Sequence, residues 1–282
     1  MITKAVIITN ELDLKFLPHS KSVSKEMMPI LNRPVIDYYV QDLKDNGITD
    51  ILFITSRNKK DIEDYYIRNI GLETELAKSY QDKRLESVQL INSDINFSFM
   101  YVNSLENPLI KAKSFIGDGS FILIIPNEIL WGESFVRQLL EIFEEVQTNV
   151  IPLRHLKYLD NINNRIVDIQ EDEYGLKITN ILECSRLEDS PSDLGIISGG
   201  LFTSDIFDYL DGLKSDSNDK INLKELYYNL IRNDNLYGCI TLGEKIDINS
   251  PMEILKGNII ATLSDNRYRD ELLDYLKEII DE

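Results

Sequence analysis

The chain has 282 residues, of which 43% are hydrophobic and 28% charged, proportions that are ordinary for a globular protein with a sizeable core. Its formal net charge of −18 disfavours nucleic acid and anionic membranes as partners, because phosphate groups would repel it. The sequence contains no run of 18 apolar residues and no secretion signal, so we expect a cytoplasmic protein without a membrane span. Cys184 and Cys239 lack metal-site spacing, which indicates a reduced compartment and no zinc.

Strand-like and helix-like segments alternate along the first half of the chain. Lys4-Ala5-Val6-Ile7-Ile8 has the length and β-branched content of a buried parallel strand. From Pro34 to Gly47 an apolar stripe with a 3.6-residue period begins at a proline and ends at a glycine, which predicts a helix. The segments that follow are expected to be a strand at 50–55, a helix at 59–66, irregular structure at 84–96, a strand at 97–102, a helical turn at 111–115 and a strand at 121–125.

This alternation predicts an α/β fold with a doubly wound, mostly parallel but mixed sheet of the Rossmann-like type, which binds ligands at the carboxyl ends of its strands. After about residue 205 we expect helices to dominate. The last is an amphipathic helix from Arg267 to Ile280, whose apolar residues are Leu272, Leu273, Leu276, Ile279 and Ile280. We therefore divide the chain into an α/β domain at 1–265 and a C-terminal helix at 266–282, packed on that domain or at a subunit contact.

Several segments resemble the bacterial UTP–glucose-1-phosphate uridylyltransferases. Lys25-Glu26-Met27-Met28-Pro29-Ile30 is similar to K-E-M-L-P-I, residues 54–65 are similar to V-T-G-R-N-K-R-x-I-E-D-H-F, and residues 243–249 are similar to G-x-x-Y-D-V-G. From their order and spacing the chain is identified as a member of this family. The resemblance implies a nucleotidyltransferase fold and an enzyme that makes UDP-glucose from UTP and glucose 1-phosphate.

The nucleotide-binding loop of the resembled family is altered here. After its first strand the family has A-A-G-x-G-T-R-x-x-P, and this chain has, in the same frame, Thr9, Asn10, Glu11, Leu12, Asp13, Leu14 and Lys15. Glycines let backbone N–H groups approach a triphosphate closely, whereas Glu11 and Asp13 would place two carboxylates where phosphate oxygens are expected. Lys15 replaces an arginine that could hold phosphate through two parallel hydrogen bonds.

Lys25 stands where the resembled family keeps its second phosphate-binding cation. Taken alone, a loop lysine is more often simply solvated, but its place directly before Glu26 and the Met-Met-Pro-Ile segment favours the phosphate-binding interpretation. The resemblance thus predicts that Lys15 and Lys25 are the remaining cations of the site.

The metal site of the resembled family is altered as well. Its central strand ends in L-x-D, whose aspartate holds Mg²⁺ with a second aspartate downstream, and here Asn127 replaces the first while Asp247 matches the second. Glu128 could substitute for Asn127, although as a strand neighbour it would face the opposite side. Asp247 could equally be a helix N-cap or loop carboxylate. We therefore expect no cofactor, and Mg²⁺ only if activity remains.

The sugar-phosphate segment V-E-K-P of the resembled family reads Leu182-Glu183-Cys184-Ser185 in this chain. Glu183 keeps the sugar-binding carboxylate, while the lysine beside it is lost. Cys184 could be a nucleophile, but a small buried core residue is the commoner interpretation because no histidine is close in sequence. In the expected base pocket, residues 103–108 have no glycine.

These changes favour a pseudoenzyme that kept the fold and lost the reaction, because nucleotidyl transfer depends on positioning and charge stabilisation. Such a protein would be a homo-oligomer, or a hetero-oligomer with an active paralogue, a glycosyltransferase or a regulator. Two alternatives stay open: a weakly active uridylyltransferase and a sensor that binds a sugar phosphate weakly. Nucleic acid and membrane are not expected partners.

Overall fold

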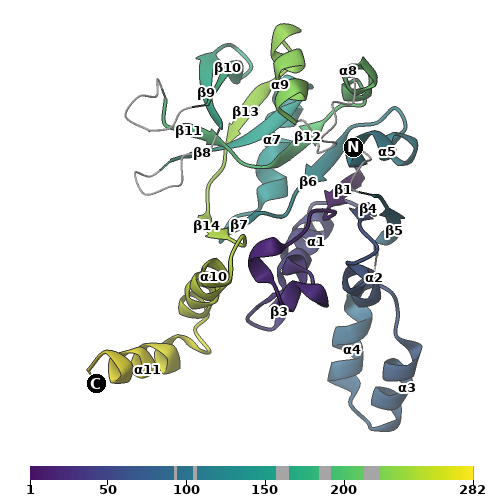
Figure 1. The fold of residues 1–282 in the computed structure, drawn as a ribbon, viewed down its shortest axis with the longest axis vertical. Helices are drawn as coiled ribbons and strands as arrows, with labels where there is room; N and C mark the ends of the chain where they lie inside the picture. Colours follow the sequence, from purple (N-terminus) through teal and green to yellow (C-terminus); the bar gives the residue numbers. More distant parts are fainter. Residues whose placement is uncertain (92–93, 104–106, 157–164, 184–191, 213–222, 282) are drawn as a thin grey trace.

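A computed structural model describes residues 1–91, 94–103, 107–156, 165–183, 192–212 and 223–281. Its centre is a ten-stranded mixed sheet with the strand order β11-β9-β10-β13-β8-β12-β6-β1-β4-β5 (Figure 1). The strands are β1 (Lys4–Ile8), β4 (Asp50–Thr55), β5 (Asn96–Tyr101), β6 (Phe121–Ile124), β8 (Val150–His155), β9 (Arg165–Glu171), β10 (Leu176–Glu183), β11 (Leu194–Ile196), β12 (Gly199–Phe202) and β13 (Tyr237–Ile240). Two small two-stranded sheets stand apart from it: the hairpin of β2 (Pro29–Ile30) with β3 (Arg33–Pro34), and the pair of β7 (Glu128–Trp131) with β14 (Glu244–Asp247).

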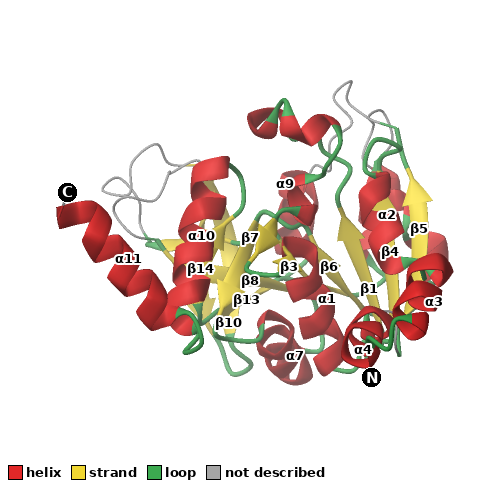
Figure 2. Cartoon of the chain, turned by 90° about the horizontal axis from the view of Figure 1, so that it is seen from below, coloured by secondary structure: helices red, strands yellow, loops and turns green. Residues whose placement is uncertain are grey.

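Helices cover both faces of the sheet, as Figure 2 shows for α1 (Val35–Asp45), α7 (Phe135–Val146) and α9 (Leu223–Arg232). The alternation of side chains along β1 explains the two layers, because Ala5 and Ile7 face one core and Val6 and Ile8 the other. The first core contains α1, α2 (Lys60–Tyr66) and α7. The second contains α5 (Pro108–Lys111), α6 (Lys113–Ile116), α8 (Ile206–Gly212) and α9.

The sheet is mixed, as expected, but it is not mostly parallel. Parallel pairing joins β5, β4, β1 and β6 in one half, and also β13 with β8. In the other half β12 runs antiparallel to β6 and β8, and β9 and β10 form an antiparallel hairpin. Gly199 and Gly200 of β12 have φ of +112° and +150°, and a Cβ there would meet the carbonyl oxygens of Leu123 and Val150 at 2.5 and 2.6 Å. These glycines therefore let the antiparallel strand enter the sheet.

One further expectation needs correction. Residues 84–90 are not irregular, because they belong to α4 (Asp82–Leu90), which packs against α3 (Ile70–Lys78) as a helical hairpin. Glu73 of α3 accepts hydrogen bonds from Arg68 and from Gln89 of α4, and these contacts between segments are not visible in the local pattern. After residue 205 helices dominate the described residues, as expected, although β13 and β14 also lie there and β13 pairs with β8 in the sheet.

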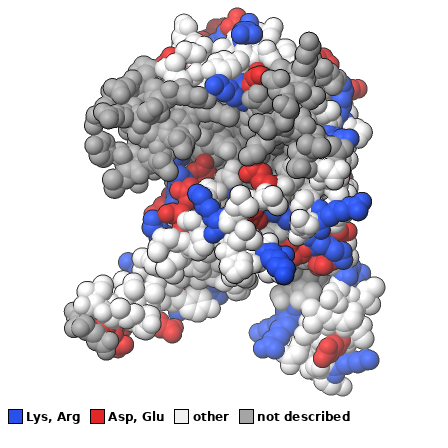
Figure 3. Space-filling view, viewed as in Figure 1, with Lys and Arg blue, Asp and Glu red and all other residues white. Residues whose placement is uncertain are grey.

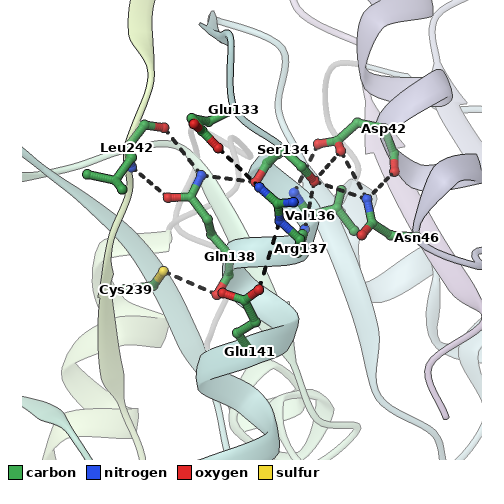
Figure 4. Close-up of polar contacts among 10 residues, drawn as sticks. All are labelled: Asp42, Asn46, Glu133, Ser134, Val136, Arg137, Gln138, Glu141, Cys239 and Leu242. Atoms are coloured by element: carbon green, nitrogen blue, oxygen red, sulfur yellow. Dashed lines mark hydrogen bonds and ion pairs between the residues drawn. The ribbon is translucent and has the colours of Figure 1, made fainter.

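A polar network fixes α7 against α1 (Figure 4). Ser134 caps α7 by accepting a hydrogen bond from the Arg137 amide at 3.0 Å, and the Asp42 carboxylate of α1 accepts one from the Val136 amide at 2.9 Å. On the other side of α7, Gln138 hydrogen-bonds to the main chain of Leu242. The start of α7 is thereby tied both to α1 and to the segment that leads into β14.

The C-terminal segment forms α10 (Pro251–Ser264) and α11 (Arg269–Asp281), which extend away from the sheet as an arm. Figure 3 shows this arm and the α3–α4 hairpin as two separate protrusions from the body. Leu272, Leu273 and Leu276 are only half-buried, while Tyr275, Ile279 and Ile280 are exposed. Within the described residues no helix is long and apolar enough to cross a membrane.

Candidate functional site

Three stretches that carry predicted site residues lie together near the carboxyl ends of β1 and β6. These strands are parallel neighbours, with Ile7 paired to Ile124, so the loop after β1 lies beside the segment that carries Asn127. The antiparallel pair of β7 and β14 places Asp247 opposite Glu128, and the Ile248 amide donates a hydrogen bond to the Asn127 carbonyl at 3.1 Å. Three stretches that are distant in sequence therefore form one edge, which we call the mouth: residues 9–28, 125–128 and 247–249.

Lys25 is buried at the centre of the mouth. Its Nζ donates hydrogen bonds to Asn127 Oδ1 at 2.8 Å and to Asn249 Oδ1 at 3.2 Å. Burial lowers the pKa of the Lys25 ammonium, and the carboxylates of Glu26, Asp13 and Glu11 oppose that effect. The expected phosphate-binding lysine is thus engaged by two amide side chains.

The Asp13 carboxylate, expected near the phosphate position, is paired with groups of the protein. Its Oδ2 lies 2.9 Å from Lys59 Nζ and accepts a hydrogen bond from the Lys25 amide at 3.0 Å. Lys59 also donates to both carboxylate oxygens of Glu26, at 3.0 and 2.8 Å. Burial raises the pKa of Glu26, and the Lys59 charge opposes this rise. The Asp13–Lys59–Glu26 cluster is therefore a buried, internally paired part of the fold.

The other loop residues differ in exposure. Glu11, Leu12, Leu14 and Lys15 are exposed, and Leu14 and Lys15 belong to a single turn of 3₁₀-helix at Leu14–Phe16. Asn10 is half-buried, and Thr9 is buried with a hydroxyl that has no hydrogen-bond partner among the described residues. The loop thus presents Leu12 and Leu14 to the outside, and Leu14 stands where the resembled family has threonine.

Asp247 lies at the end of β14, so it is neither a helix N-cap nor a loop residue. Its Oδ2 is 2.9 Å from Lys245 Nζ, which is also 3.3 Å from Glu128 Oε2. Arg154 Nε lies 3.7 Å from the same Glu128 oxygen. Burial raises the pKa of Glu128, while Lys245 and Arg154 oppose the rise. The carboxylates of Glu128 and Asp247 are accordingly both paired with cations of the protein.

The donor set of the mouth does not fit Mg²⁺. Among the described residues no group of three histidine, cysteine, aspartate or glutamate side chains could hold a metal ion. The side-chain oxygens of Asn127 and Asn249 are neutral and already accept from the Lys25 ammonium, whereas Mg²⁺ is usually held by carboxylates and substrate phosphates.

Other predicted site segments lie partly or wholly outside the described residues. Glu183 is the last residue of β10, and its side chain is outside the described part. Residues 184–185 and 104–106 are outside it as well, which includes Cys184 and the centre of the expected base pocket.

Three residues in or beside the mouth were not singled out from the sequence: Glu26, Asn249 and Lys59, which pairs with Asp13 and Glu26. All three belong to the segments that carry the family resemblance, and Asn249 stands where G-x-x-Y-D-V-G ends in glycine. That departure from glycine is the signal that could have identified Asn249. Lys59 and Glu26 gave no comparable signal, because charged residues in loops are usually solvated.

Comparisons with known proteins relate the whole chain to one family and one fold. The sequence profile described as "Nucleotidyl transferase" matches residues 14–248. A UTP–glucose-1-phosphate uridylyltransferase of Staphylococcus haemolyticus is 28% identical, with 99% of this chain and 98% of the relative covered. The protein YngB of Bacillus subtilis, a UTP–glucose-1-phosphate uridylyltransferase, is 27% identical, with 99% and 96% covered. The UTP-bound UGPase from Acinetobacter baumannii has the same fold, with a TM-score of 0.88, 24% identity and 99% of both chains covered.

Proposed function

Because this chain belongs to the nucleotidyl transferase family, we propose that it is a uridylyltransferase-like protein that keeps the fold without the transfer reaction. The observation that carries the proposal is the pair of hydrogen bonds from the Lys25 ammonium to Asn127 and Asn249. In this arrangement the neutral amide of Asn127 stands where a metal-dependent transfer needs a charged ligand, and the Lys25 ammonium is held by the protein.

The charge changes at the mouth act together. Glu11 is exposed on a loop without the two glycines, and Lys15 replaces arginine. Removing one group that stabilises charge in a transition state typically costs about 3 kcal/mol, or about a hundredfold in rate. Several such losses in one site would leave a rate too small to support a pathway.

The role we propose is that of a non-catalytic subunit or interaction protein in sugar-nucleotide metabolism of the cytoplasm. It would form homo-oligomers, or hetero-oligomers with an active paralogue or a glycosyltransferase. The exposed apolar residues of α11, Tyr275, Ile279 and Ile280, support an interaction surface on the C-terminal arm.

A weakly active uridylyltransferase is the second candidate. It is favoured by the similarity to the S. haemolyticus uridylyltransferase, which extends over 99% of this chain. Weak binding of a sugar phosphate without turnover is a third candidate, for which the position of Glu183 at the end of β10 is the observation.

The decisive experiment measures pyrophosphate release with UTP, glucose 1-phosphate and Mg²⁺, using the S. haemolyticus uridylyltransferase as a positive control. We expect no release above the protein-free rate. Calorimetric titration with UTP or UDP-glucose plus Mg²⁺ should show no binding tighter than millimolar. Turnover above that background, or micromolar binding of either nucleotide, would favour the enzyme instead.

A further inference from the structure

Lys25 is held in the mouth both by its main chain and by its ammonium group. The Lys25 amide donates to Asp13 Oδ2 at 3.0 Å, and the Lys25 carbonyl accepts from the Met28 amide at 3.1 Å. The preceding residue, Ser24, donates through its amide and its hydroxyl to the Asp61 carboxylate, at 2.6 and 2.7 Å. The backbone that carries the lysine is therefore held at this point of the mouth.

The two amides that receive the ammonium have determined orientations. A lysine ammonium only donates hydrogen bonds, so the oxygen of each amide must face it. The Asn249 side-chain nitrogen Nδ2 then donates to the main-chain carbonyl of Asn127 at 2.9 Å, which holds the Asn249 side chain beside residue 127. The side-chain oxygens of Asn127 and Asn249 thus point to the same place, and the Nζ of Lys25 occupies it.

The charge at this point is already balanced by the chain. Glu26, Asp13 and Glu11 act electrostatically on Lys25, and Lys59 pairs with the first two. A divalent cation brought to the two amide oxygens would meet the ammonium a few ångströms away. The two like charges would repel, and the repulsion is twice as large for a divalent ion as for a monovalent one.

We propose that the Lys25 ammonium is a built-in cation, which occupies the oxygen ligands Asn127 and Asn249 in place of a bound divalent metal. The mouth then takes neither Mg²⁺ nor Mn²⁺ while Lys25 is present. The inference rests on the proposed function for the location of the site. It fails if a metal binds, whereas the proposed function fails if pyrophosphate is released.

The first test is electron paramagnetic resonance of free Mn²⁺ with the parent protein and with Asn127→Asp. The free signal is expected to stay unchanged by either protein up to millimolar Mn²⁺, because a new carboxylate at position 127 would pair with Lys25 instead of a metal. Micromolar Mn²⁺ binding by the parent, or Mn²⁺ binding gained by Asn127→Asp with Lys25 in place, would overturn the proposal.

The second test removes the built-in cation. In Lys25→Ala, the side-chain oxygens of Asn127 and Asn249 and the nearby carboxylates should bind an external cation. Methylammonium or Mn²⁺ should therefore raise the Tm of this variant by at least about 2 °C. Neither ion should change the Tm of the parent or of Lys21→Ala, a matched control at an exposed lysine of the same loop. A folded Lys25→Ala that responds to neither cation would show that the position is not a cation site. If Lys25→Ala does not fold, the Mn²⁺ titration of the first test decides.

Discussion

Lys59 and Asp13 form a buried ion pair that fixes the loop after β1 to the start of α2. Nζ and Oδ2 are 2.9 Å apart, and the two side chains are only 6% and 4% exposed. The carboxylate that the sequence suggested would repel phosphate is thus turned inward, where it neutralises a lysine. The loop has become a structural element with its own charge pairing.

Replacing Asp13 should therefore weaken the fold. Asp13→Gly leaves Lys59 with Glu26 alone and frees the Lys25 amide, and loss of one partner of a buried pair typically costs about 3 kcal/mol. Glu11→Gly is the matched control, because Glu11 is exposed and its loss should change the free energy of unfolding by less than about 0.5 kcal/mol. Urea denaturation measures both, and equal effects would contradict the structural role of Asp13.

The doubly substituted protein, Glu11→Gly with Asp13→Gly, is not expected to recover nucleotide binding. Lys25 remains held by Asn127 and Asn249, and Lys15 is exposed on the loop. Titration with UTP and Mg²⁺ should again give only millimolar affinity. A micromolar dissociation constant would mean that the two glycines alone are sufficient to rebuild the cradle.

Asn127→Asp should not restore transfer. The new carboxylate would lie 2.8 Å from the Lys25 ammonium if the side chain keeps its position, and would form an ion pair instead of a metal site. Pyrophosphate release with UTP, glucose 1-phosphate and Mg²⁺ should equal that of the parent. A tenfold gain in UDP-glucose formation, abolished by Asp247→Ala, would support a weakened enzyme.

The C-terminal arm should mediate self-association. Ile280 is 79% and Tyr275 58% exposed, and burial of such side chains between two copies would remove apolar surface from water. Light scattering at several concentrations should give at least a dimer, and Tyr275→Asp with Ile280→Asp should shift it to monomer. Ile67→Asp, at an exposed residue after α2, is the control that should stay dimeric. A parent mass near 32.6 kDa at all concentrations would argue against the subunit role.

Cys239 should resist alkylation in the folded protein. Burial in β13 raises the pKa of its thiol to about 12, with a smaller contribution from Glu141, and the Sγ donates to the Gln138 carbonyl (Figure 4). Because only the thiolate reacts, about one molecule in ten thousand is reactive at pH 8. Iodoacetamide followed by peptide mass analysis should find this cysteine unmodified until denaturant is added. Rapid modification at pH 8 in the native state would contradict the burial.

The sequence by itself determined the family and also the order of the elements around the mouth. Buried strands such as Lys4–Ile8 and the helix after Pro34 follow from local periodicity and end signals, which need no knowledge of the rest of the chain. The ordered motifs, including residues 25–30 and 243–249, placed Lys25, Asn127 and Asp247 as candidates, and the structure brings the stretches that carry them to one edge.

Only the tertiary structure decided what these residues contact. Lys25 binds Asn127 across 102 positions of the chain and Asn249 across 224, and Asp13 pairs with Lys59 instead of facing the outside. Local patterns carry no information on such pairings, because the choice of partner depends on strand order and on which charges the fold removes from water. For the same reason β13 and its parallel pairing with β8 were missed, since a four-residue apolar strand acquires its place only from the sheet that receives it.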